Sequence, residues 1–207
     1  MFLFESTLNQ ILESIEMDKQ FKILFESKWR KMVKFLHNNT KFKPSAVAKA
    51  GSIGKHTEIQ RSDLDVIFSI PSDDFRKKVY PLMVNELKSC FGKIAFIKQG
   101  DQAIHVDFYK PAVKIDLVLL FESLFMENYE AIQDIRQLNY TQLNAIKLVK
   151  YAIYQNDLED EIPSYLIEQI GFDFAGYSLV DTINLIIQQL NIDYNESINI
   201  FRTLSTV

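Results

Sequence analysis

Apolar and polar positions divide the chain into two halves of different character. Up to Phe121, short stretches in which every second residue is apolar alternate with longer stretches of helical period. The pattern predicts strands over residues 45–51, 63–70, 93–99, 103–110 and 113–121 and helices over 5–15, 18–37 and 73–92. Pro81 is expected either to kink or to split the last of these helices. This mixture of strands and helices predicts an α+β lobe.

Beyond Phe121 the apolar positions follow a helical period throughout. The predicted helices cover residues 140–155, 162–170, 178–191 and 195–204, and Pro163 stands at the start of the second, where its missing N–H does no harm. No Gly/Ser-rich linker separates the two halves. We therefore expect residues 1–121 and residues 122–207 to form two tightly packed domains.

The composition is ordinary for a soluble globular protein, with 47% hydrophobic and 24% charged residues in 207. No apolar run approaches the roughly 18 residues of a membrane span. Glu5 interrupts the apolar N-terminal stretch and no basic segment precedes it, so we expect no signal peptide. The single cysteine, Cys90, excludes an internal disulfide and a cysteine metal cluster. These features together predict a cytoplasmic protein.

Charge is unevenly distributed along the chain. Residues 1–121 contain 19 Lys and Arg against 14 Asp and Glu, a net charge of +5, whereas residues 122–207 contain 4 against 13, a net charge of −9. The basic excess is densest between Met17 and Arg61, where eleven basic residues stand against three acidic ones. Such an excess in an acidic protein favours a local anion-binding face.

The predicted helix over residues 18–37 shows where that face would lie. Its apolar residues recur at three- and four-residue steps and form one stripe, made by Phe21, Phe25, Trp29, Met32 and Leu36. Arg30, Lys31 and Lys34 lie away from this stripe and are the candidate polyanion face. The alternative is a solvated helix face that only balances the acidic half of the chain.

Two aspartates stand one residue apart in an otherwise apolar predicted strand, within "GSIGKHTEIQRSDLDVIF". Residues i and i+2 of a strand point to the same face, so Asp63 and Asp65 project side by side and repel each other. A divalent cation such as Mg²⁺ removes this conflict. Asp116 stands in another apolar strand, and three convergent carboxylates predict a two-metal site for phosphoryl transfer. The alternative is an exposed edge or a capped turn.

A small glycine turn precedes the two aspartates. Gly51 and Ser52 follow a predicted strand, where backbone N–H groups and the Ser52 hydroxyl would face an anion and Lys55 would add charge. Lys55 could equally be a solvated loop charge. His105 is expected to be structural, and Asp107 fits the third carboxylate less well than Asp116, whose two neighbours are both apolar.

These residues resemble the signature of a known superfamily. Gly51-Ser52, then Asp63-Leu64-Asp65, then Asp116 are similar to the motif of the polymerase-β-like nucleotidyltransferases. The sequence of residues 51–68 most closely resembles the branch of oligoadenylate synthases, cyclic GMP-AMP synthase and bacterial CD-NTases. The resemblance extends in patches over roughly residues 45–175.

The same resemblance includes the helical half. "LNAIKLVKYAI" followed by "IPSYLIEQI" resembles the helical lobe of these enzymes. By that resemblance Lys150 would contact the nucleotide triphosphate, Ser164 would hydrogen-bond the nucleotide and Tyr165 would stack on its base. The alternative for Lys150 and Tyr165 is an ordinary exposed lysine and a core tyrosine.

The resemblance implies a palm-like mixed sheet with flanking helices over residues 1–121 and a short helical lobe over 122–207 that completes a nucleotide cleft. It implies a template-independent enzyme that uses two Mg²⁺ or Mn²⁺ ions, held by the three aspartates. This enzyme would join NTPs, ATP or GTP, into a small oligo- or cyclic nucleotide and release pyrophosphate. Such a product is typical of second-messenger signalling in antiviral defence. It also implies a nucleic-acid activator, because in these families a long helix before the catalytic strands contacts nucleic acid.

Two other functions stay open. The same carboxylates would serve nucleotide transfer to an RNA 3′ end or to a protein side chain, although an acidic chain is a poor basis for an extensive RNA-tracking groove. A catalytically idle nucleotide- or nucleic-acid-binding module is the third reading. It is disfavoured because three charges are kept within strands.

Overall fold

The computed structural model describes residues 3–39, 41–42, 44–60, 62–70 and 76–206. Lys43 and Arg61 of the basic segment, and the predicted start of the third helix at 73–75, lie outside the described residues. The chain divides into two compact units. The sheet unit consists of Met17–Lys55 and Arg61–Gln133, and the helical unit consists of Met1–Glu16, His56–Gln60 and Asp134–Val207. The expected domain boundary at residue 121 stays a prediction.

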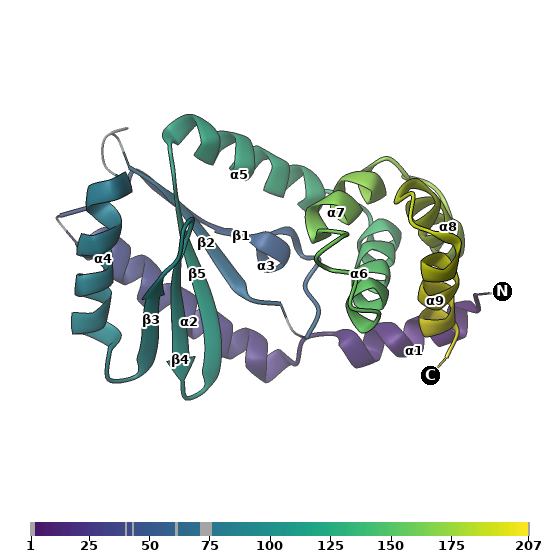
Figure 1. The fold of residues 1–207 in the computed structure, drawn as a ribbon, viewed down its shortest axis with the longest axis horizontal. Coiled ribbons are helices and arrows are strands. Elements are labelled where there is room, and N and C mark those ends of the chain that lie inside the picture. The colour runs from purple at the N-terminus through teal and green to yellow at the C-terminus, as the bar shows by residue number, and fades with distance from the viewer. Residues whose placement is uncertain (1–2, 40, 43, 61, 71–75, 207) are drawn as a thin grey trace. The chain divides into compact units, whose positions relative to one another are not determined.

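The sheet unit is built on a mixed five-stranded sheet of order β1-β2-β5-β4-β3 (Figure 1). The strands are β1 (Ala46–Ala50), β2 (Leu64–Ser69), β3 (Ala95–Gln99), β4 (Ile104–Tyr109) and β5 (Ala112–Leu120). The β2–β5 pair is parallel, and the pairs β1–β2, β4–β5 and β3–β4 are antiparallel. The α+β fold with a mixed sheet and flanking helices is therefore confirmed.

The two faces of this sheet differ in what covers them. One face carries the main apolar core, where α2 (Lys19–Asn38) and α4 (Arg76–Phe91) pack over the alternating apolar residues of the strands. On the other face, Phe125 and Ile132 of α5 (Glu122–Arg136) cover only β1, β2 and the end of β5. The polar residues of β2, β4 and β5 share that second face.

The helical unit is organised around α6 (Tyr140–Gln155), which contacts α1, α7, α8 and α9. Its partners are α1 (Glu5–Ile15), α7 (Ser164–Phe172), α8 (Leu179–Gln189) and α9 (Tyr194–Ser205). Because it is packed on several sides, α6 buries Ala145, Leu148 and Ala152 in addition to the stripe through Ile146, Val149 and Ile153 that its period predicts.

Side-chain caps fix where several of these helices begin. Asp18 accepts hydrogen bonds from the backbone N–H groups of Gln20 and Phe21 at the start of α2. Asn139 and Asp193 form reciprocal capping boxes at the starts of α6 and α9, and Ser178 caps α8. Polar residues before apolar-periodic runs therefore set these boundaries, and the predicted helices fall close to them.

Three details differ from or complete the expectation. Pro81 lies inside one continuous helix, α4, and does not split it. The glycine turn is the start of a five-residue helix, α3 (Gly51–Lys55), and α5 was expected only as part of a helical region. A search of the described helices finds none with the length and apolar character needed to cross a membrane.

Candidate active site

Asp65 and Asp116 lie opposite each other in the parallel register of β2 and β5. Register partners on neighbouring strands point to the same face at a backbone spacing of about 4.8 Å. Asp63 immediately precedes β2. The structure thus places Asp65 and Asp116 side by side on the sheet face that α5 covers only at one end, with Asp63 just before the start of β2.

The pKa of Asp63 is raised by its surroundings. Partial loss of hydration raises the pKa of Asp63, and the charges of Asp116 and Asp107 raise it further. Lys114 and His105 act in the opposite direction. Asp63 therefore interacts with a cluster of charged side chains on β4 and β5, although its own side chain reaches solvent.

The backbone of Gly51 lies directly against the carboxylate of Asp65. The backbone of Gly51 has φ +56, and a Cβ atom built on it would lie 1.7 Å from Oδ2 of Asp65. Glycine is required both by this left-handed backbone and by the close approach of the carboxylate. The Gly-Ser turn and the Asp-x-Asp pair are thus one structural unit, in which Gly51 makes the room that the Asp65 carboxylate occupies.

This contact predicts a large effect of Gly51→Ala. Asp65 has to move to accommodate the methyl group. We therefore expect at least a tenfold loss of the nucleotide transfer that the sequence resemblance implies, measured as pyrophosphate release from NTPs. Gly176→Ala is the matched control, because Gly176 also has a positive φ, +87, but nothing lies within 4 Å of its Cβ position. The control should lose about 1 kcal/mol of stability and keep its activity. Equal activity loss in the two variants would show that backbone strain alone is responsible.

Ser52 and Lys55 lie within α3, in the same sheet unit as the carboxylates. Both side chains are half-buried and both already interact with other protein groups. Their placement one and four residues after Gly51 keeps them beside the turn that contacts Asp65. Their roles toward a phosphate stay predictions.

The residues fit a hard divalent cation in chemistry and in placement, since carboxylate oxygens are the ligands that Mg²⁺ prefers. The side chains do not stand in a coordinating arrangement: among the described residues, no three His, Cys, Asp or Glu groups are placed to hold a metal ion. Oδ1 of Asp116 is hydrogen-bonded to Nδ1 of His105, at 2.8 Å. Sequence reasoning treated His105 as structural and missed this contact.

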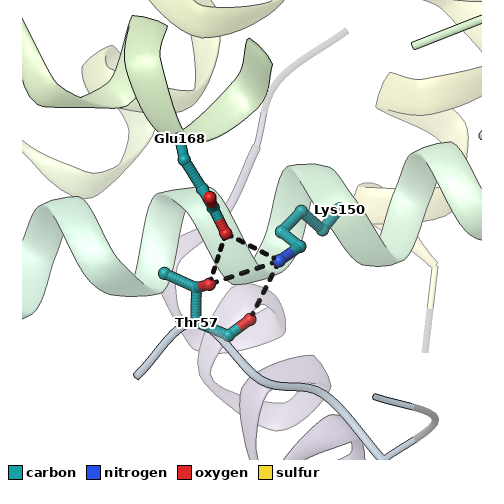
Figure 2. Close-up of polar contacts among 3 residues, drawn as sticks. All are labelled: Thr57, Lys150 and Glu168. Atoms are coloured by element: carbon teal, nitrogen blue, oxygen red, sulfur yellow. Dashed lines mark hydrogen bonds and ion pairs between the residues drawn. The ribbon is translucent and has the colours of Figure 1, made fainter. Parts of the chain in front are cut away.

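Lys150 is buried in the helical unit, with a relative exposure of only 5%. Its Nζ donates to Oε1 of Glu168 at 3.1 Å, to Oγ1 of Thr57 at 3.2 Å and to the Thr57 carbonyl oxygen at 3.4 Å, as Figure 2 shows. Thr57 in turn donates to Glu168 at 2.7 Å. The alternative of an ordinary exposed lysine is therefore wrong. A contact between Lys150 and a triphosphate stays a prediction, and it would require Lys150 to exchange these protein partners.

Ser164 and Tyr165 are the first two residues of α7, after the N-cap residue Pro163. Both side chains are exposed, and Tyr165 retains 59% of its surface. The alternative of a core tyrosine is therefore wrong. An exposed ring at a helix start is sterically available for stacking.

The basic segment is less uniform than its composition suggests. Lys28 is buried, with Nζ 4.2 Å from the centroid of the Phe108 ring, and burial lowers the pKa of Lys28. Lys49 pairs with Glu26, and Lys41 pairs with Glu86. The net charge of the segment includes these three lysines, so it overestimates how many basic side chains are available to bind an anion.

The candidate polyanion face itself is exposed. Arg30, Lys31 and Lys34 all reach solvent on α2, and Arg30 also pairs with Glu26 at 3.3 Å. Lys31 and Lys34 line a shallow cavity of about 390 Å³, together with Phe35, Asn38, Asn39, Cys90 and Phe91. This combination of lysines, aromatic rings and amides could contact a phosphate and a base.

Comparisons with known proteins identify the fold. A scan of protein-family models and a search of curated proteins found no match to this sequence. Among solved structures, the chain is similar to CdnC of E. coli MS115-1 in its complex with HORMA-deltaN, with a TM-score of 0.66 and 15% identity over 89% of this chain and 70% of that one. It is similar to the Cid1 poly(U) polymerase with Mg and 3′-dATP bound, with a TM-score of 0.69 and 11% identity over 88% and 71%.

A third similar structure is the GLD-2/RNP-8 complex, with a TM-score of 0.61 and 16% identity over 84% of this chain and 58% of that one. At these identities the likeness concerns the fold. The chain has the fold of polymerase-β-like nucleotidyltransferases, as its motifs indicated.

Proposed function

We propose that this chain, which has the polymerase-β-like nucleotidyltransferase fold, is a metal-dependent and template-independent nucleotidyltransferase. It joins NTPs, ATP or GTP, into a small oligo- or cyclic nucleotide and releases pyrophosphate. The observation that supports this proposal most directly is the register pairing of Asp65 with Asp116, with Asp63 before β2 and Gly51 against Asp65.

Each residue of this cluster has a role in the proposed reaction. Asp63 and Asp65 would hold two divalent cations, and Asp116 would hold one of them and help to deprotonate the attacking ribose hydroxyl. When bound, the two Mg²⁺ ions supply charge neutralisation at the attacking and leaving oxygens. Gly51 and Ser52 present backbone and side-chain donors to the phosphates. The protein contributes mainly positioning, because the nucleophile and the α-phosphate have to be held in line.

Transfer of a nucleotide to an RNA 3′ end is the second candidate. It is favoured by the likeness to the Cid1 poly(U) polymerase, which is similar in extent to the likeness to CdnC. Both reactions need the same carboxylates, so the cluster does not separate them. The acceptor, a nucleotide or an RNA end, is the difference between the two proposals.

Mass spectrometry of products tests both proposals. The chain is incubated with all four NTPs and Mg²⁺ or Mn²⁺, with and without a short single-stranded RNA. Short or cyclic oligonucleotides formed without RNA support the first proposal, and extension of the RNA supports the second. No product under either condition, with a folded protein, would contradict nucleotidyl transfer and favour an idle binding module.

Tyr165 is proposed to stack on the base of the bound nucleotide, with Ser164 beside it as a hydrogen-bond partner. Tyr165→Ala should weaken NTP binding by about 1–3 kcal/mol, the usual value of base–aromatic stacking. Tyr194→Ala is the control, because Tyr194 is an exposed tyrosine of the same unit, at the start of α9. The proposal fails if KM for every NTP is the same in Tyr165→Ala as in the wild type.

The face formed by Arg30, Lys31 and Lys34 is proposed to bind a polyanion, a nucleic-acid activator or acceptor. Changing all three to Glu should reduce nucleic-acid binding at least tenfold at low salt, and wild-type binding should fall steeply as salt increases. The control with the same charge change is Lys93, Lys98 and Lys110 to Glu, since these side chains are exposed elsewhere on the sheet unit.

Cys90 allows a direct check of the same face. It is the single cysteine of the chain, it is exposed, and it lines the cavity beside Lys31 and Lys34. Bound nucleic acid should therefore slow the reaction of Cys90 with a thiol reagent. If neither binding nor activity with added RNA or DNA changes in the triple variant, the face is only solvated.

A further inference from the structure

A row of residues crosses the sheet through the proposed catalytic carboxylates. The strand registers align Asp65 of β2 with Asp116 of β5, Asp116 with His105 of β4, and His105 with Lys98 of β3. Register partners point to the same face of a sheet. His105 therefore stands on the side of Asp116 that faces away from Asp65, in the next strand along the row.

The contact between His105 and Asp116 is a well-formed hydrogen bond. Nδ1 of His105 lies 2.8 Å from Oδ1 of Asp116. An ionised carboxylate can only accept, so Nδ1 of the imidazole carries the proton and donates it. The bond occupies one oxygen of Asp116 and leaves the second oxygen for another partner.

Gly100 leaves space for the other side of the His105 ring. A Cβ atom built on Gly100 would lie 2.7 Å from Nε2 of His105, so glycine at this position leaves the room that the imidazole occupies. The His105 side chain is still 40% exposed, which is too much for a residue kept only to fill the core. The bond to Asp116 is thus the polar contact that orients the ring, and Gly100 leaves space for it.

We propose that His105 is a positioning residue for the reaction. It holds Oδ1 of Asp116, fixes the rotation of that carboxylate and directs its second oxygen toward Asp65 and Asp63. Carboxylates that bind metals are typically held by such outer partners, and loss of one commonly costs 10- to 100-fold in metal affinity or activity. This inference rests on the proposed function, because it assigns His105 a purpose only if Asp116 acts on a cation or a hydroxyl.

Three variants test the proposal. His105→Ala removes the donor, His105→Asn places an amide N–H where Nδ1 stands, and Lys98→Ala changes the next exposed residue of the same row. Mn²⁺ affinity of the nucleotide-free protein is measured by titration calorimetry, and kcat and KM for NTP are measured in parallel. We expect His105→Ala to lose 10- to 100-fold in Mn²⁺ affinity and in kcat, with KM little changed. His105→Asn should recover most of both losses, and Lys98→Ala should behave as the wild type.

The outcomes separate this inference from the proposed function. Wild-type Mn²⁺ binding and turnover that persist unchanged in His105→Ala would overturn the positioning role and leave the proposed function standing. A lower melting temperature of His105→Ala with unchanged Mn²⁺ affinity would likewise make His105 structural. A wild-type chain that binds no Mn²⁺ and forms no product would overturn both. Nitrogen NMR of the imidazole gives a further readout, since a proton on Nε2 in place of Nδ1 contradicts the proposed bond.

Discussion

Replacing Asp65 with Asn is expected to abolish the proposed nucleotide transfer and to leave the fold intact. The amide keeps the size of the side chain, but it removes a negative charge that the proposed reaction needs to hold its cations. Loss of several kcal/mol of transition-state stabilisation corresponds to a fall of about 10³-fold or more in kcat. Asp116→Asn should behave in the same way. Pyrophosphate release and circular dichroism measure the two parts of the expectation.

Asp107→Asn is the matched control, because Asp107 is a carboxylate of the same sheet face, on β4, opposite Lys114. It should retain activity within about tenfold of the wild type, since it is not one of the proposed cation ligands. If Asp107→Asn is as inactive as Asp116→Asn, then the third carboxylate is assigned wrongly. If Asp65→Asn stays active, the metal-dependent reaction itself is contradicted.

The raised pKa of Asp63 makes the stability of the nucleotide-free and metal-free protein depend on pH. The pKa of Asp63 is raised above its ordinary value of 3.8, mainly by loss of hydration. The stability that a raised pKa confers is complete below the ordinary value and is lost as the pH rises through the raised one. Asp63→Asn should therefore melt at a higher temperature than the wild type at neutral pH. This difference should shrink as the pH falls toward and below 3.8.

The largest expected loss of stability comes from breaking the buried pair of Lys150 and Glu168. Both side chains are only 4% exposed, so removal of either partner leaves a buried charge without its counter-ion. Such losses typically cost about 3–5 kcal/mol. For a chain of this size each kcal/mol lowers the melting temperature by about 2–4 °C. Lys150→Met and Glu168→Gln should therefore melt roughly 6–20 °C below the wild type.

A double variant and a surface control make this prediction specific. Lys150→Met combined with Glu168→Leu removes both charges and should be more stable than either single variant, because no unpaired charge remains buried. Arg30→Met breaks the exposed pair with Glu26 and should cost less than about 1 kcal/mol. If the single Lys150 variant melts within 2 °C of the wild type, the pair contributes no more than a surface contact.

Much of the sheet unit could be predicted from the sequence because its strands either alternate between apolar and polar residues or are short apolar runs. Every second residue of "VKIDLVLLF" lies on the main core face, namely Val113, Ile115, Leu117 and Leu119. This leaves Asp116 on the opposite face with Val118 and Leu120. The pairing of β4 with β5 in a hairpin could also have been predicted from the sequence. With Lys110 and Pro111 at its tip, His105 stands opposite Asp116, so the contact that sequence reasoning missed follows from the turn position.

Other features could not be read from the chain because they depend on long-range packing. The helical period of α6 predicts an apolar face, but it does not indicate that other helices cover α6 on several sides. This packing on several sides buries Lys150. The partner of Lys150 is 18 residues away in α7, and Thr57 is 93 residues away. The charge excess of the basic segment likewise included Lys28 as if it were a surface charge, although its ammonium group packs against the ring of Phe108.

The division of the chain has a consequence for how this protein can be cut or recombined. The helical unit is made of three separate segments, and His56–Gln60 is joined at both ends to the sheet unit. Thr57, which binds Lys150 and Glu168, lies in that short middle segment. Neither unit is therefore a continuous stretch that could be expressed alone or exchanged between relatives as a module. A single proteolytic cut between residues 133 and 134 would therefore distribute the helical unit over both fragments, because residues 1–16 and 56–60 lie before the cut and residues 134–207 after it. During synthesis, all residues of the sheet unit are made before residue 134, whereas the helical unit lacks its largest segment until residues 134–207 follow.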